Sequence, residues 1–256
     1  REGMLIEGFH EKSTMYVNYN YPYYPQHIEG FNLLKKDNDW VEYRIKVPEV
    51  TPPKFAKTAE MIEKRYNLHV RKFTKNELVK QGMGREVFHI VNETYKDLYD
   101  FQQLTEKQID DYVDSYIKIA DTNLITGVVD GNDNNRLIGF GVSFPSLTDA
   151  LQKIGNGKLL PWGWWQIVKA LKLHKTDTVD LVLIGVLPEY RSKGANALIF
   201  ADLTSNITAT ASSGPRRCRR WKPTRAYRAS GSIWRACSIA AAAATNRNYK
   251  LNFSMF

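Results

Sequence analysis

The sequence has little cysteine and no long hydrophobic run, and both scarcities exclude classes of protein. Only 2 of the 256 residues are cysteine, which is too few for a disulfide framework or a four-cysteine metal site. No segment approaches the roughly 20 consecutive apolar residues that cross a bilayer. The polar, mixed-charge start has no hydrophobic segment typical of a secretion signal. We therefore expect a cytoplasmic protein without a membrane partner, and the five scattered histidines give no reason to expect a metal.

Acidic residues are missing from the last part of the chain. Between Leu203 and Phe256 there is no Asp or Glu, but there are eight Arg and two Lys. The residues before Leu203 hold 26 basic and 27 acidic side chains, so the formal charge of +9 belongs to the tail. Taken literally, the segment Arg216–Lys222 is an arginine-rich arm for RNA or DNA, with Trp221 available for stacking.

The same tail composition is typical of a G+C-rich gene read out of frame. Trp221 is encoded by TGG and the codon of Lys222 begins with AA, so a codon that straddles them reads GAA, for glutamate. We interpret residues 205–256 as a basic, disordered tail produced by a one-base shift near Ser205, and expect no specific nucleic-acid partner. An uninterrupted frame in the nucleotide source would contradict this interpretation.

The period of the apolar residues divides the rest of the chain into helices and strands. Helical spacing predicts helices over residues 55–66, 88–98 and 160–172, and the capping-box pair Thr105 and Gln108 opens another. This last helix should bury four residues: Ile109, Val113, Tyr116 and Ala120. A hairpin is predicted from strands 123–130 and 136–145, followed by a buried strand over 178–187 and a helix over 197–203. We expect Trp162, Trp164 and Trp165 to pack in the core, with an acceptor pocket as the alternative.

Proline marks the boundary between two units. Residues 41–47 alternate as in a half-buried strand, and Pro48, Pro52 and Pro53 make residues 48–54 the expected linker. The domain that follows, residues 55–204, has the order helices, hairpin, helix, strand, glycine loop, helix. This order predicts an α+β fold with a three-layer α/β/α-like arrangement, in which helices flank a mixed, mostly antiparallel sheet.

The last strand of this domain leads into a glycine loop that could bind an anion. It delivers the chain to Arg191-Ser192-Lys193-Gly194 at the start of a helix, where backbone N–H groups lack partners and the helix dipole is positive. Neither a Walker loop nor a dinucleotide-binding fingerprint is present. The alternative is an ordinary strand-to-helix connection with solvated charges.

The segment Val186–Gly194 resembles the acyl-CoA-binding motif of the GNAT superfamily of N-acyltransferases, Arg/Gln-x-x-Gly-x-Gly/Ala. Arg191 and Gly194 match the motif, whereas its last position is Asn196. The strand carrying Leu137–Phe140 resembles the third strand of that family. The resemblance implies that loop amides hold the pyrophosphate of acetyl-CoA and that the preceding strand offers backbone groups to the pantetheine arm. The implied binding residues are Ile184, Gly185, Val186, Leu187, Arg191, Ser192, Lys193, Gly194, Ala195 and Asn196.

The reaction implied by this resemblance is transfer of an acetyl or other acyl group from acyl-CoA to an amine of a small molecule or peptide. A backbone N–H would meet the developing oxyanion, and a carboxylate could act as base. Glu189 and Asp180 are the acids nearest to the motif, but the sequence does not identify a catalytic residue. A catalytically inactive GNAT-like ligand sensor and a nucleic-acid-binding protein acting through the tail are the alternatives.

Residues 1–47 resemble the last helix and closing strands of another GNAT-like domain. On this interpretation the chain is an N-terminally truncated tandem of two such domains. The alternative is that residues 1–47 complete the sheet of the second domain. A shifted frame would also replace the segment that packs beside the CoA strand in this family, so we expect any acyltransferase activity of this polypeptide to be impaired.

Overall fold

The computed structural model of the chain describes residues 3–11, 14, 18–31, 39–42, 52–117, 120–154, 157–171, 178–212 and 227–230. The arginine-rich segment Arg216–Lys222 and most of the expected strand and linker between residues 41 and 54 lie outside these ranges. The frame-shift interpretation of the tail therefore stays a prediction.

A four-stranded sheet forms the centre of the molecule. Its strands are β3 (Leu68–Arg71), β4 (Ile125–Asp130), β5 (Arg136–Pro145) and β6 (Val179–Val186), in the order β3-β4-β5-β6. All three pairings are antiparallel. The sequence predicts a mixed, mostly antiparallel sheet, and the described part of the sheet is antiparallel throughout. The predicted hairpin is confirmed, because β4 pairs with β5 and a turn over residues 131–135 joins them.

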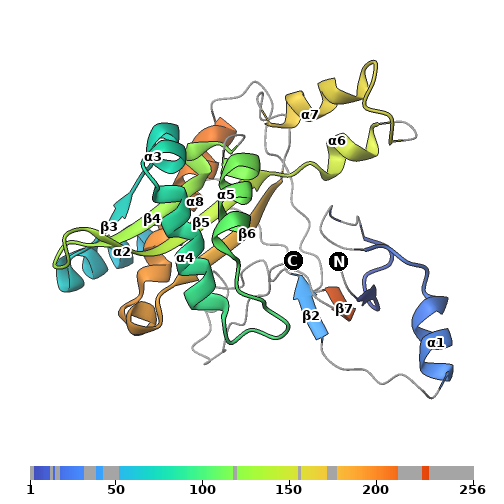
Figure 1. Cartoon of the computed structure of the whole chain (residues 1–256), viewed down its shortest axis with the longest axis horizontal. Helices are drawn as coiled ribbons and strands as arrows, with labels where there is room; N and C mark the ends of the chain where they lie inside the picture. Colours follow the sequence, from blue (N-terminus) through green and yellow to red (C-terminus); the bar gives the residue numbers. More distant parts are fainter. Residues whose placement is uncertain are drawn as a thin grey trace.

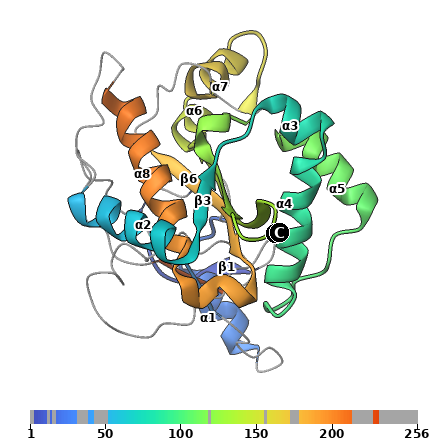
Figure 2. The ribbon, with the colours of Figure 1, turned by 90° about the vertical axis from the view of Figure 1, so that its left-hand side faces the viewer.

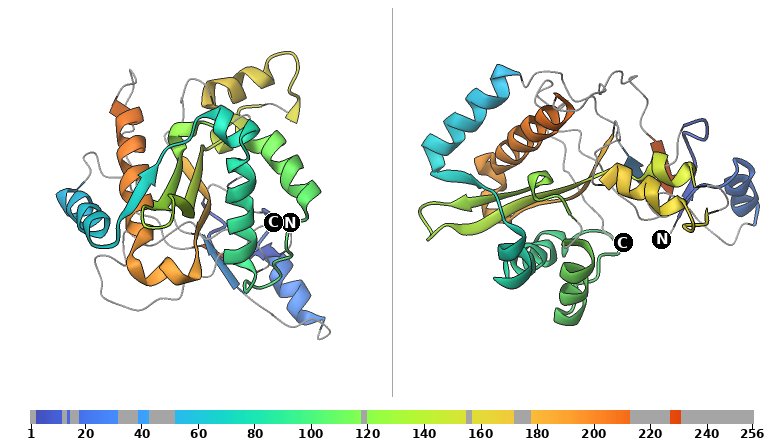
Figure 3. Two further views of the ribbon diagram at one scale, coloured as in Figure 1. Left: turned by 60° about the vertical axis from the view of Figure 1, so that its left-hand side comes forward. Right: turned by 90° about the horizontal axis from the view of Figure 1, so that it is seen from above.

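Helices cover both faces of this sheet and give the α+β fold that the sequence predicts (Figures 2 and 3). On one face lie α2 (Pro53–Tyr66) and α8 (Ala195–Ser212), which contact each other. On the other face α4 (Met83–Tyr95) packs on β5 and β6, with α3 (Lys75–Lys80) and α5 (Glu106–Tyr112) beside it. The core between the layers includes fully buried Leu68, Ile125, Ile138, Phe140, Leu198 and Ile199.

The helices predicted over residues 55–66 and 88–98 are confirmed as α2 and α4, although α2 begins inside the expected linker, at Pro53. The capping box at α5 is also present, because Thr105 Oγ1 accepts from the Gln108 amide and Gln108 Oε1 accepts from the Thr105 amide. The prediction for Tyr116 is wrong, since this side chain is 48% exposed. Tyr116 lies in a π-helical turn over Val113–Ile117 that follows α5, and Ile117 is buried in its place, whereas Ile109, Val113 and Ala120 are buried as predicted.

Residues near both ends of the chain form a separate small sheet. β7 (Tyr227–Ser230) lies between β1 (Met4–Leu5) and β2 (Asp39–Glu42), and both pairings are antiparallel. None of these strands joins the four-stranded sheet. α1 (Tyr23–Gly30) lies between β1 and β2 in sequence. α8 starts two residues earlier than predicted and runs to Ser212, which is beyond the domain end expected at residue 204.

Two short helices, α6 (Thr148–Gln152) and α7 (Gly163–Leu171), connect β5 to β6 and stand away from the three layers (Figure 1). The predicted core packing of the tryptophans here is wrong, because Trp162 is 76%, Trp164 45% and Trp165 40% exposed. None of the helices in the described ranges has the length and apolar content that crossing a membrane requires.

Candidate functional site

The candidate site lies where β6 passes into α8 at one end of the sheet (Figure 1). Between them the chain makes a 3-10 turn over Pro188–Lys193, called η4, and then bends at Gly194. Gly194 has φ of +80°, a conformation that side-chain-bearing residues rarely adopt. A Cβ atom at this position would lie 2.9 Å from Ile62 Cδ1 on α2. The glycine therefore permits both the turn and the close approach of α2.

The start of α8 has the electrostatic character of an anion site. Its first turn contains no acidic residue, so nothing there offsets the partial positive charge of the helix N-terminus. Arg191 and Ser192 are exposed in the preceding turn, while Lys193 and Asn196 are half-buried. Helix amides and an adjoining lysine can together receive a phosphate group.

A buried tyrosine–aspartate pair holds this turn against the hairpin. The hydroxyl of Tyr190 in η4 donates to Asp130 Oδ2 at the end of β4, over 2.8 Å. Burial and this hydrogen bond raise the pKa of Tyr190 to about 12. Burial alone would raise the pKa of Asp130, but hydrogen bonds from Asn132 and Tyr190 hold it below its ordinary value. Lys193 Nζ lies 4.1 Å from the centre of the Tyr190 ring, in a cation–π contact.

Arg191 is used largely within the fold. Its Nη2 donates to the carbonyl oxygen of Thr94 near the end of α4, over 3.2 Å, and its Nε donates to that of Val186 over 3.3 Å. A cation near the C-terminal end of a helix is favourable because the dipole is negative there. Arg191 thus ties α4, β6 and η4 together, a role that the resemblance did not predict.

The outer edge of β6 is closed at one point by a side chain. Ile184 donates its backbone N–H to the Tyr95 hydroxyl over 3.2 Å, and the same hydroxyl donates to the Ile184 carbonyl over 2.8 Å. The Leu187 amide donates to the Ile138 carbonyl on the β5 side. Several backbone groups expected to receive a pantetheine arm therefore already have partners, which a ligand would have to replace.

Gly185 lets α4 approach this part of β6. A Cβ atom there would lie 2.8 Å from Thr94 Oγ1 and 2.8 Å from the Phe140 ring. Both distances are too short for ordinary packing. The absence of a side chain therefore places Thr94 and Tyr95 of α4 directly beside the strand.

The ten predicted binding residues form one continuous path through β6, η4 and the first turn of α8. Sequence reasoning missed the residues that position this path, which come from far along the chain: Thr94, Tyr95, Asp130 and Asn132. For Asp130 and Asn132 the turn-forming composition was the only sequence signal. Glu189 is exposed, with its Oε1 3.9 Å from Arg136 Nη2. Asp180 lies near the start of β6, opposite Phe144 of β5 in the strand register. The structure does not assign either Glu189 or Asp180 as a base.

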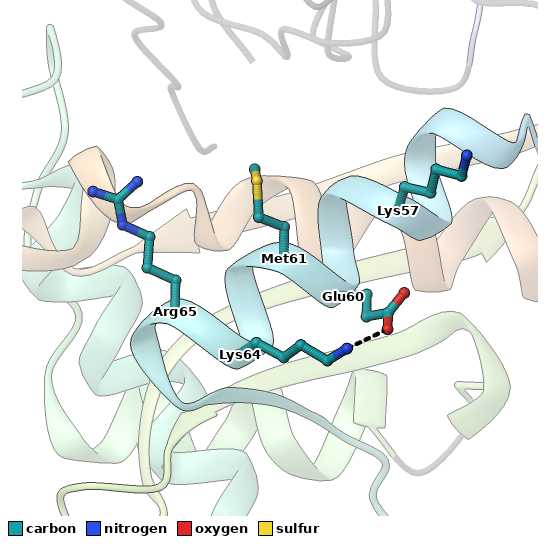
Figure 4. A pocket seen from close by; sticks show the side chains of 5 residues that line it. All are labelled: Lys57, Glu60, Met61, Lys64 and Arg65. Carbon is teal, nitrogen blue, oxygen red and sulfur yellow. Dashed lines mark hydrogen bonds and ion pairs between the residues drawn. The ribbon is translucent and has the colours of Figure 1, made fainter.

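A hollow of about 490 Å³ lies on the outer surface of α2, lined by Lys57, Glu60, Met61, Lys64 and Arg65 (Figure 4). Lys64 Nζ and Glu60 Oε1 are paired at 2.6 Å. Ile62, which contacts the site at Gly194, lies on the other side of the helix, so this hollow is separate from the candidate site. Among the described residues, no group of three or more His, Cys, Asp or Glu side chains could hold a metal ion.

No family model matches the chain. The protein YghO of Escherichia coli strain K12 is similar to it, with 24% identity over 193 residues. The matching region covers 74% of this chain and 46% of YghO, so the chain spans about half the length of this curated relative. Identity at this level does not assign the chain to a family.

Proposed function

We propose that the chain is a GNAT-type acyl-CoA N-acyltransferase, which transfers an acetyl or other acyl group from the coenzyme to an amine. The observation that carries the proposal is the β6–Gly194–α8 unit. An antiparallel strand whose second half is buried leads to a left-handed glycine and then to a helix whose first turn has no acid. This is the arrangement that the resemblance of Arg191 and Gly194 implies for holding a pyrophosphate.

The residues around the turn fit an acyl-CoA by charge and by access. The amide of half-buried Asn196 at the start of α8 would receive the pyrophosphate, with Lys193 alongside, whereas Ala195 is fully buried. Ser192 is exposed at the rim and leaves room for the ligand. The pantetheine arm would run along β6 towards Ile184, and its thioester supplies the activated acyl group. A backbone N–H of β6 that faces this arm would stabilise the developing oxyanion.

Equilibrium binding of acetyl-CoA by isothermal calorimetry, with the full chain, tests the proposal. Ser192→Glu places a negative charge beside the expected pyrophosphate, and we expect about a tenfold loss of affinity. Gln103→Glu adds the same charge at an exposed position in another part of the chain and should leave affinity unchanged. The basic tail can also attract phosphates, but both variants keep the tail, so their difference reports the loop alone. Equal affinities for the two variants, or no binding by the parent, would refute the assignment.

A further inference from the structure

The tip between α6 and α7 carries the most exposed large apolar side chains described in this structure. Leu160 and Trp162 are each 76% exposed, and Trp164 and Trp165 follow on α7. We call these four residues the tryptophan tip. In Figure 1 the two helices stand at the margin of the molecule, beyond the end of the sheet. The tip is therefore a convex apolar projection rather than part of the core.

Lysines flank the tip along the chain. Lys153 and Lys158 are exposed on its approach, and Lys169 Nζ lies 5.7 Å from the centre of the Trp165 ring. Between Leu147 and Leu171 the sequence has one acid, Asp149. The surface thus combines apolar rings with an excess of lysine, independently of the tail.

The indole rings of Trp164 and Trp165 are held in place from within. Trp164 Nε1 donates to the Pro161 carbonyl over 2.8 Å, so this N–H group is already satisfied by the protein. The rings of Trp164 and Trp165 meet edge to face, with 5.7 Å between their centres. Ordered rings lose little conformational entropy when a partner covers them.

We propose that the tryptophan tip is a contact site for the surface of bilayers that contain anionic phospholipids. Tryptophan is favoured at the boundary between headgroups and acyl chains, and lysines near that boundary are attracted by anionic headgroups. A convex tip can enter this layer without a matching groove. The expectation of no membrane partner rested on spanning segments and a secretion signal, neither of which bears on surface contact.

The charge distribution favours a bilayer over a second copy of the chain. In a symmetric dimer the same surface meets itself, which would bring Lys153 and Lys158 towards the equivalent lysines of the other copy. Anionic headgroups instead complement these charges. Each lysine near such a surface contributes about a fivefold gain in affinity, and each apolar side chain that becomes buried contributes roughly ten- to a hundredfold.

The test is co-sedimentation of the full chain with phosphatidylcholine vesicles that contain or lack phosphatidylglycerol. We expect binding to the anionic vesicles and quenching of tryptophan fluorescence by brominated acyl chains. The double variant L160S/W162S should lose at least tenfold in affinity without a change in charge. The matched control, Y21S/Y23S, replaces two aromatic residues of the α1 region that are 61% and 50% exposed, and should bind as the parent does.

A second pair of variants separates the tip from the basic tail. We expect K153Q/K158Q to lose more than tenfold at low salt, whereas K57Q/K64Q on α2 should behave as the parent. Equal losses in the two lysine pairs would show that unspecific charge attraction drives binding, and would overturn the proposal. Unchanged vesicle affinity of L160S/W162S would also overturn the proposal. If sedimentation velocity then shows that this variant has lost a dimer, the tip is a contact between two copies of the chain instead. Unfolding curves that match those of the parent establish that each variant is folded.

Discussion

Replacing Tyr190 by phenylalanine removes one buried hydrogen bond and keeps the ring. Tyr190 and Asp130 are only 7% and 6% exposed, and the bond between them measures 2.8 Å. A hydrogen bond to a charged group contributes about 1.5–3 kcal/mol. The other carboxylate oxygen of Asp130 keeps its two bonds from Asn132, so the charge remains partly satisfied. We therefore expect Y190F to lower the free energy of unfolding by about 2 kcal/mol near neutral pH.

The pH dependence of this loss identifies its source. The pKa of Tyr190 is raised to about 12 in the folded protein, from about 10 in an unfolded chain. Because the folded state holds the phenol proton more tightly, its contribution is complete below about pH 10 and is lost as the pH rises through about 12. The difference between a pKa of about 10 in the unfolded chain and about 12 in the folded protein corresponds to about 2–3 kcal/mol of stability. The stability advantage of the parent over Y190F should therefore shrink above about pH 10 and largely disappear by about pH 12.

Urea unfolding, followed by circular dichroism at a series of pH values, measures this difference directly. Other tyrosines and lysines also titrate in the alkaline range, but their effect cancels when parent and variant are compared at the same pH. Tyr116→Phe is the matched control, because Tyr116 is 48% exposed and its replacement should change stability by less than about 0.5 kcal/mol. A stability difference between the parent and Y190F that does not change with pH would refute the reasoning, even if Y190F proved destabilised.

Two further substitutions examine the same region. Gly194→Ala should lower the free energy of unfolding by about 1–2 kcal/mol for the left-handed backbone alone, and more because its Cβ would lie 2.9 Å from Ile62 Cδ1. Gly82→Ala is the control for the cost of the left-handed backbone alone, because Gly82 has a similar φ of +83° and nothing would lie within 4 Å of a Cβ atom there. If urea unfolding gives equal losses of stability for the two variants, the close approach of Ile62 contributes nothing. Tyr95→Phe should cost about 1–3 kcal/mol and accelerate hydrogen exchange of the Ile184 amide, whose bond to the hydroxyl it removes; unchanged exchange would contradict the edge contact.

Three of the four strands of the sheet, β4, β5 and β6, and its main helices could be predicted because their signals are local, whereas β3 was missed. A turn rich in Asn, Asp and Gly between two apolar runs specifies the β4–β5 hairpin, and the Thr105 capping box specifies the start of α5. The predictions of burial were wrong where tertiary packing determines which side chains are exposed. Helical spacing cannot reveal that a π-helical turn exposes Tyr116, nor that Trp162 points to solvent. An apolar side chain has the same spacing pattern whether it faces the core or an exposed tip.

The candidate site was predictable as a segment but not as a structure. Gly194 and the following helix could be identified because the glycine separates an apolar strand from an apolar helix and, with Arg191, matches the motif of the resemblance. The partners of the loop could not, because Asp130 precedes Tyr190 by 60 residues and Thr94 precedes Arg191 by 97 residues. Such contacts depend on the packing of α4 and β4 against β6. Arg191 shows the consequence, since its charge, expected to face a ligand, is largely directed to backbone carbonyls.

The two parts of the proposed ligand site make different demands on the fold. At the start of α8, helix geometry leaves the first N–H groups without internal partners, and half-buried Asn196 can present its amide, whereas Ala195 is fully buried. The edge of β6 is different, since Tyr95 bridges Ile184 and Arg191 holds the Val186 carbonyl. A ligand fragment that carries only the pyrophosphate and nucleotide can bind without displacing these bonds, whereas an acyl-pantetheine arm must replace them. If the arm binds along β6, loss of the Tyr95 hydroxyl should favour acetyl-CoA over the nucleotide fragment. This change in preference separates binding along the strand from simple attraction of phosphate to the loop.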